Sequence, residues 1–104
     1  MAKKPRPATP RVIVTRRLPP NVEARMAELF DMSFNVGDVP MDRAALARAM
    51  AQCDVLVPSI GDQIDAALIA AAPERLQLIA SFGSGVDHID LAAAREKRII
   101  VTNT

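Results

Sequence analysis

The chain has 104 residues, of which half are hydrophobic, about a quarter are charged and only 3% are aromatic, with no Trp or Tyr. That length leaves room for one hydrophobic core, and so few aromatic side chains exclude a base-stacking surface for single-stranded nucleic acid. Four of the thirteen basic residues fall in the first eleven positions, and the nine that follow face twelve acidic residues, which excludes a basic, phosphate-gripping domain.

The first ten residues contain three prolines and no apolar run. This composition predicts a disordered tail over 1–10, for which a solubilising role is favoured over contact with nucleic acid or an acidic partner. No apolar stretch follows the lysines as in a signal peptide, and no run is long enough to cross a membrane. Cys53 is the only cysteine, so it is predicted to be a small buried packing residue. These features predict a cytoplasmic protein with no nucleic-acid or membrane partner.

Strand and helix patterns alternate after this tail. The β-branched run at 11–15 predicts a strand that is buried on both faces. A proline pair then precedes Asn21, which is predicted to cap a helix with apolar positions at a 3.6-residue period. Apolar and polar residues alternate over 32–36, which predicts a half-buried strand at the edge of a sheet.

Three further helices are predicted to begin at an aspartate, because an Asp side chain can accept hydrogen bonds from the unpaired amides of a first helical turn. These capping residues are Asp42, Asp65 and Asp90. Apolar residues flank the first two caps in the spacing of a hydrophobic staple, Met41 with Leu46 and Ile64 with Ile69. The remaining strands are predicted over 54–58, 76–82 and 99–102, and Asp54 is interpreted as a strand-entry residue.

Five strands separated by helices imply a parallel sheet with right-handed crossovers. The strand at 32–36 alternates whereas the others are nearly continuously apolar, which places it at an edge. The sequence therefore predicts an α/β fold, a flavodoxin-like doubly wound parallel five-stranded sheet in the order 2-1-3-4-5. The chain stops after the fifth strand, so the final helix of this fold is expected to be missing.

Ligands of an open parallel sheet bind beyond the carboxyl ends of its strands. The first strand leads to Arg16 and Arg17, which excludes both the acidic pocket of a phosphoacceptor receiver domain and the glycine-rich phosphate loop of a flavodoxin. A P-loop sequence is absent. Because no cluster of His, Cys, Asp and Glu has the spacing of metal ligands, no metal site is predicted.

The loop Gly83-Ser84-Gly85 follows the fourth strand and is the best candidate site. It is not a dinucleotide fingerprint, because His88 occupies the third glycine position and no acid closes the next strand. Glycines allow unusual φ angles and close approach, so such a loop can present consecutive backbone amides to a small anion such as a carboxylate. The alternative is a tight turn that needs glycine only for its geometry.

Asp87 and His88 form a candidate acid–base pair in the same loop. Since the two are sequence neighbours, the favoured interpretation is a turn with an acidic residue near the N-terminus of the last helix. No catalytic residue is therefore predicted in this chain.

The segments 78–90 and 99–104, with support from 11–16 and 54–59, resemble the NAD(P)-dependent D-isomer-specific 2-hydroxyacid dehydrogenases, and within them the glyoxylate and hydroxypyruvate reductases. The resemblance implies that 11–104 is the N-terminal flavodoxin-like substrate domain, truncated before the Rossmann NAD(P)-binding domain. It also implies that the amides around Gly83, Ser84 and Gly85 hold the substrate carboxylate, while Ser59 and Ile60 wall the pocket.

The implied reaction is reduction of a 2-keto acid to a D-2-hydroxy acid with NAD or NADP as the cofactor. The family's catalytic Arg, Glu and His and its nucleotide loop lie beyond position 104, so the isolated chain is expected to be inactive and to bind no cofactor. Homo-oligomerisation is expected, with self-association through the sheet face left bare by the missing helix. Two alternatives stay open: a free-standing module that binds small carboxylates without catalysis, and a structural fragment without a ligand.

Overall fold

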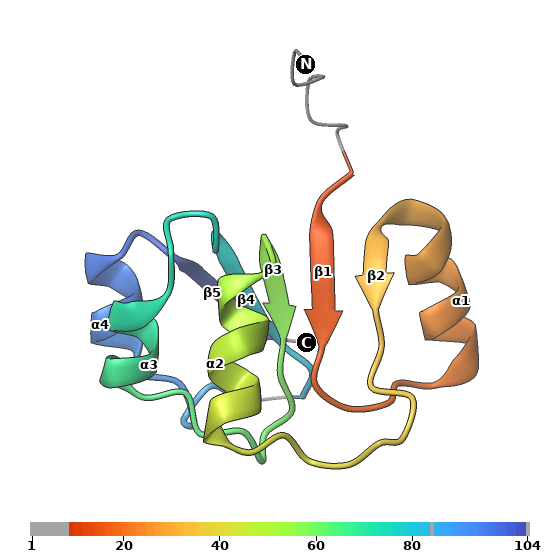
Figure 1. Ribbon diagram of the computed structural model, residues 1–104, viewed down its shortest axis with the longest axis horizontal. Coiled ribbons are helices and arrows are strands. Elements are labelled where there is room, and N and C mark those ends of the chain that lie inside the picture. The colour runs from red at the N-terminus through yellow and green to blue at the C-terminus, as the bar shows by residue number, and fades with distance from the viewer. Residues whose placement is uncertain (1–8, 84, 104) are drawn as a thin grey trace.

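A computed structural model describes residues 9–83 and 85–103 of the chain (Figure 1). Its elements in chain order are β1 (Arg11–Val14), α1 (Pro20–Leu29), β2 (Asp31–Ser33), α2 (Arg43–Ala51), β3 (Val55–Val57), α3 (Ala66–Ala71), β4 (Leu78–Ser81), α4 (Leu91–Glu96) and β5 (Ile100–Asn103). The alternation of strands and helices is the one that the sequence predicts. The tail expected over 1–10 lies almost wholly outside the described residues. Within the described part of the chain, no helix has the length and apolar character needed to cross a membrane.

The five strands form one sheet in the order β2-β1-β3-β4-β5, and every pair is parallel. This confirms the predicted topology and places β2 at an edge. The register sets Val12 beside Val55, and Val55 beside Leu78, so alternate residues of neighbouring strands share one face of the sheet. Loops that leave the carboxyl ends of the strands consequently gather at one edge.

Each face of the sheet carries its own apolar cluster. The larger cluster joins Ile13, Leu56 and Ile79 of the strands to buried residues of α2, α3 and α4. The smaller cluster lies on the opposite face, where Val12 and Val14 pack against partly buried residues of α1. In Figure 1, α3 and α4 lie side by side near β5, whereas α1 stands at the other end of the sheet beside β2.

The three aspartate caps are confirmed. Asp42, Asp65 and Asp90 accept hydrogen bonds from the backbone amides three residues on, at 2.8, 3.0 and 3.0 Å. The staples fit as well, since Met41 packs against the large cluster that contains Leu46, and that cluster also contains both Ile64 and Ile69. These local signals fix where α2, α3 and α4 begin.

Asn21 does not cap the first helix, in contrast to the prediction. The cap position is Pro19, two residues earlier, and the helix α1 begins at Pro20 with no side-chain capping bond. Proline suits the first helical turn because it lacks the N–H that would otherwise go unpaired. The carboxylate of Glu23 instead accepts a hydrogen bond of 2.9 Å from the amide of Leu18, which precedes the helix.

The second strand is shorter than predicted, because β2 ends at Ser33 and the residues up to Val36 form a loop. In this loop the side chain of Asn35, and not the backbone, makes the bonds to neighbouring segments. Its amide donates to the carbonyl oxygens of Thr15 at 2.7 Å and Val39 at 2.6 Å. A side-chain bond to the backbone of this kind competes with the strand ladder. Val36, expected in the strand, is 78% exposed.

Candidate functional site

The loops that follow β3 and β4 begin side by side at the carboxyl edge of the sheet. Ser59 and Phe82 form an isolated parallel bridge beyond the ends of the two strands, and the amide of Phe82 donates to the carbonyl oxygen of Pro58 at 2.9 Å. The predicted wall residues therefore lie directly beside the start of the predicted glycine loop.

Gly83 has a backbone conformation that other residues rarely adopt, with φ at +150°. A Cβ atom at this position would lie 2.9 Å from the Cγ2 atom of Ile60, closer than van der Waals contact allows. Both the torsion angle and the close approach require glycine here. At Gly83, glycine is thus needed for the backbone conformation and for packing against Ile60, which fits the interpretation of this loop as a tight turn.

An open pocket of about 360 Å³ lies between these loops and the start of α4. It is lined by Ile60, Gln63, Gly85, Asp87 and His88. A Cβ atom added at Gly85 would meet nothing within 4 Å, so the side of this residue on which a side chain would stand is open. Of the predicted site residues, Ile60 and Gly85 thus line the pocket, and Ser84 lies outside the described residues.

His88 is part of the pocket wall but is largely buried, with 8% of its surface exposed. Its Nε2 atom lies 3.1 Å from the hydroxyl of Ser81, which in turn donates to the carbonyl oxygen of Gly85 at 3.2 Å. Since the serine proton is used in the second bond, the first requires Nε2–H of His88 as the donor. Ser81 and His88 therefore link the glycine loop to the end of β4.

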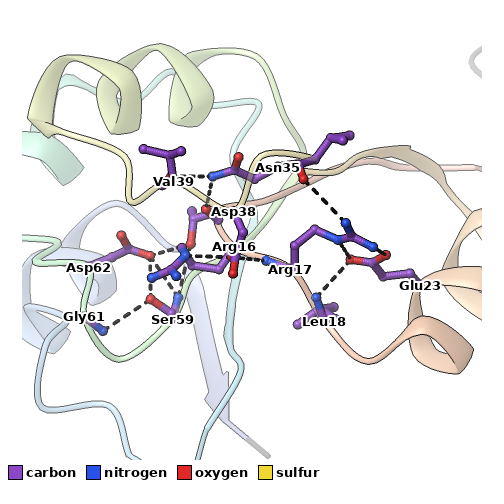
Figure 2. Close-up of polar contacts among 12 residues, drawn as sticks. Arg16, Arg17, Leu18, Glu23, Asn35, Asp38, Val39, Ser59, Gly61 and Asp62 are labelled. Atoms are coloured by element: carbon purple, nitrogen blue, oxygen red, sulfur yellow. Dashed lines mark hydrogen bonds and ion pairs between the residues drawn. The ribbon is translucent and has the colours of Figure 1, made fainter.

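A buried carboxylate lies behind the wall, at a position that the sequence did not single out. Asp62 is 4% exposed, and its Oδ2 atom accepts hydrogen bonds from the amide and the hydroxyl of Ser59 (Figure 2). The same atom accepts a hydrogen bond from the hydroxyl of Thr15. Ser59 therefore turns towards Asp62, whereas Ile60 faces the pocket. The spacing Ser59-x-x-Asp62 in a loop that follows a buried strand was the available signal.

Two ion pairs stabilise the loop after β1 (Figure 2). Arg17 binds Glu23 through two hydrogen bonds of 2.9 Å, and Arg16 binds Asp38 at 2.9 Å. The bond from Arg17 holds the pKa of Glu23 below its usual value, and the bond from Arg16 does the same for the pKa of Asp38. Both arginines already have carboxylate partners, so this loop does not offer a phosphate site.

The remaining candidate groups do not point to other chemistry. Cys53 is fully buried, and burial raises the pKa of its thiol to about 11, which confirms the predicted packing role. Among the described residues, no three His, Cys, Asp or Glu side chains are grouped so that they could hold a metal ion.

The glycine loop does not fit the pyrophosphate of a dinucleotide. His88, at the third glycine position, is buried against Ser81, and the carboxylate of Asp90 occupies the N-terminus of α4 by accepting the amide of Ala93. A helix N-terminus that binds phosphate must leave these amides open.

Residues 12–104 match the family model of the D-isomer specific 2-hydroxyacid dehydrogenase, catalytic domain. A glyoxylate reductase of Korarchaeum cryptofilum is 35% identical over 95 residues, and one of Thermofilum pendens is 36% identical over 98 residues. These alignments cover 91% and 93% of this chain but only 28% and 29% of the relatives. The chain therefore spans less than a third of the length of the curated relatives it matches.

Solved structures give the same picture. A protein of Polaromonas sp. superposes with a TM-score of 0.84 at 31% identity, covering 89% of this chain and 29% of that one. An NADPH-dependent glyoxylate/hydroxypyruvate reductase of Sinorhizobium meliloti, solved in complex with NADP and malonate, superposes with a TM-score of 0.66 at 28% identity. That alignment covers 93% of this chain and 28% of the reductase.

Proposed function

We propose, because this chain belongs to the D-isomer specific 2-hydroxyacid dehydrogenase family, that it is the substrate-binding portion of an oxidoreductase. The parent enzyme would reduce small 2-keto acids, of the glyoxylate and hydroxypyruvate kind, to D-2-hydroxy acids with NAD or NADP as the cofactor. The relatives named glyoxylate reductase support the substrate class. Because the loop after β4 does not fit a dinucleotide, the cofactor and the catalytic groups would belong to the rest of the parent enzyme.

The proposal rests on the contact between Gly83 and Ile60 at the edge of the pocket. This contact brings a glycine loop, in which Gly85 lines the pocket, against a wall that continues from β3. Backbone amides in such a loop donate hydrogen bonds to a carboxylate, and bonds to a charged acceptor are stronger than those between neutral groups. The role proposed for Gly83, Ser84 and Gly85 is thus to hold the substrate carboxylate, and that of Ser59 and Ile60 to bound the pocket.

A titration of the ¹⁵N-labelled chain with glyoxylate tests this proposal by nuclear magnetic resonance. Saturable shifts are expected at the amides of Ile60, Gly83 and Gly85, with no comparable change at Gly37 in the distant loop after β2. Glycolaldehyde, which lacks the carboxylate, serves as the control ligand and is expected to leave the amides unshifted. Equal shifts with both ligands, or none with glyoxylate, would refute a carboxylate site.

A second measurement separates a portion of a reductase from an independent carboxylate-binding module. The chain alone is expected to show no reductase activity and no heat of NADH binding by calorimetry. Saturable NADH binding by this chain would contradict the proposed division of the parent enzyme. Extension of the reading frame past Thr104 into a glycine-rich nucleotide loop would support the reductase, and a natural stop codon would support the module.

We further propose that the isolated chain self-associates through the uncovered part of the sheet. Ile100, on the edge strand β5, is 64% exposed, and Phe82 at the end of β4 is 40% exposed. Exposed apolar strips of this kind favour association in solution.

A further inference from the structure

We propose that Asp62 is a positioning residue for the carboxylate site: its buried side chain fixes the wall at Ser59 and Ile60 against Gly83 without touching the ligand. This inference rests on the proposed function of that site and deepens it. It concerns a residue that lies one layer behind the pocket, at the carboxyl ends of β1 and β3.

The first argument is the set of donors around Asp62. Its Oδ2 atom accepts three hydrogen bonds: from the hydroxyl of Thr15, from the amide of Ser59 at 2.9 Å and from the hydroxyl of Ser59 at 3.2 Å. Thr15 is fully buried and Asp62 nearly so. Removing a carboxylate from water is unfavourable unless hydrogen bonds compensate it, so all the donors are needed together. The carboxylate therefore ties the end of β1 to the loop after β3.

The second argument is the tight turn that these bonds close. The amide of Asp62 donates to the carbonyl oxygen of Ser59 at 3.1 Å, and the amide of Gly61 donates to the hydroxyl of Ser59 at 3.3 Å (Figure 2). Ser59 is thus bonded to Asp62 through its amide, its hydroxyl and its carbonyl oxygen. The backbone of Ile60 lies inside this turn, so a shift of the turn moves Ile60 with it.

The third argument is the distance between Ile60 and the glycine loop. Because the Cγ2 atom of Ile60 lies 2.9 Å from the Cβ position of Gly83, a shift of the turn either opens this contact or displaces the loop. The chain of contacts from Thr15 through Asp62 and Ser59 to Ile60 therefore ends at the proposed carboxylate cradle. A displacement of about 1 Å is enough to impair a binding geometry that depends on directed hydrogen bonds.

The position of Asp62 in the fold distinguishes it from the other structural aspartates. Asp42, Asp65 and Asp90 each cap a helix, whereas α3 begins at Ala66 with Asp65 as its cap and so does not use Asp62. Among the described residues, the side chain of Asp62 bonds to Thr15 and Ser59, at the carboxyl edge of the sheet. Its effect is expected at the site and not at a helix end.

The test compares Asp62→Asn with Asp42→Ala, which removes the distant cap of α2 and so destabilises the fold away from the site, in the labelled chain. In the first variant, the nuclear Overhauser effect between the Cγ2 methyl of Ile60 and the α-protons of Gly83 is expected to weaken. The dissociation constant for glyoxylate is expected to rise at least about tenfold. In the second variant both readouts stay as in the unchanged chain, even though its urea midpoint falls. Thr15→Val, which removes one donor and keeps the shape, is expected to produce a smaller change in the same direction and serves if Asp62→Asn does not fold.

If the role of Asp62 is purely structural, Asp62→Asn lowers the urea midpoint but leaves the nuclear Overhauser effect between Ile60 and Gly83 and the glyoxylate affinity unchanged. That result overturns the proposal. A weakened Ile60–Gly83 effect with unchanged glyoxylate affinity overturns it too. If the unchanged chain binds no glyoxylate, the proposed function fails, and the Ile60–Gly83 effect alone then decides whether Asp62 positions the wall.

Discussion

The two faces of the sheet differ in how completely they are covered. On one face, the neighbouring residues Ile13, Leu56 and Ile79 are at most 6% exposed beneath α2, α3 and α4. On the other face, the row that begins with Val12, at 3% exposed, ends with Ile100, at 64%. One face, called the finished face below, is therefore covered by helices across the sheet. On the other, called the open face, the apolar cluster ends before β5.

The helices explain this difference. The helix α2 buries Leu46, Ala49 and Met50, whereas α1 buries none of its residues fully and packs mainly beside β2. Hydrophobic stabilisation scales with the apolar area removed from water, so the finished face carries most of the stability of this fold. The open face is free to contact another surface, and substitutions on the two faces should accordingly have different effects.

The largest effect is expected from a cavity in the finished face. Ile79→Ala removes a side chain that is fully buried in the large cluster, and it is expected to lower the free energy of unfolding by about 2–5 kcal/mol. Urea denaturation followed by circular dichroism measures this change. Ile100→Ala, on the other face, is the control and should change the free energy by no more than about 0.5 kcal/mol. Equal losses in the two variants would abolish the distinction between the faces.

The next effect is expected at the carboxyl edge, where loops from the strands meet. Gly83→Ala forces a side chain into a conformation with φ at +150° and against Ile60, so a loss of about 1–3 kcal/mol is expected. Gly85→Ala, two residues away in open space, is the control and should leave the urea midpoint nearly unchanged. If both variants unfold at the same urea concentration, the strain assigned to Gly83 is absent.

A smaller effect on folding, but a direct one on assembly, is expected on the open face. Ile100→Lys places a charge on the uncovered strand β5 and is expected to reduce the self-associated mass by about twofold, as for dimer dissociation. Size-exclusion chromatography with light scattering measures the mass. Val36→Lys, at an exposed apolar residue of the loop after β2, is the matched control and should leave the mass unchanged. A monomeric unchanged chain at high concentration would contradict the proposed association.

Short-range contacts account for most of what the sequence predicted correctly. The caps at Asp42, Asp65 and Asp90 act on amides only three residues away, so their sequence signals were sufficient. Asn21 failed as a cap because the preceding proline is itself suited to the first turn. The end of β2 was missed because Asn35 bonds to the distant carbonyl of Thr15, a contact that no local pattern shows.

The candidate site likewise contains residues that local sequence patterns indicate and one that depends on a long-range contact. The sequence singles out the glycine loop and the segment at Ser59 and Ile60 because both follow strand ends, and the structure brings Ile60 and Gly85 to one pocket. Asp62 was missed: the spacing to Ser59 shows only its local partner, since Thr15 lies 47 positions away and becomes a neighbour only when β1 and β3 pair. Ser84 was also predicted in the site, but it lies outside the described residues.

The smallest effect is expected from the ion pair that joins two helix starts on the finished face. Arg43, at the start of α2, binds the cap of α3 at 2.7 and 3.0 Å, and these bonds lower the pKa of Asp65 to about 2. Because the folded-state pKa lies below the unfolded value, the stabilisation is present above about pH 4 and is lost as the pH falls towards 2. Arg43→Ala is expected to raise the pKa of Asp65 towards its usual value and to weaken this pH dependence, which a carboxyl-carbon NMR titration and acid denaturation measure. Both side chains are about half exposed, so the stability at neutral pH should change little.

The control is Arg25→Ala, which removes an exposed arginine from α1 and should leave the pKa of Asp65 unchanged. If the pKa of Asp65 stays near 2 in Arg43→Ala, the shift is instead caused by the hydrogen bond from the amide of Leu68.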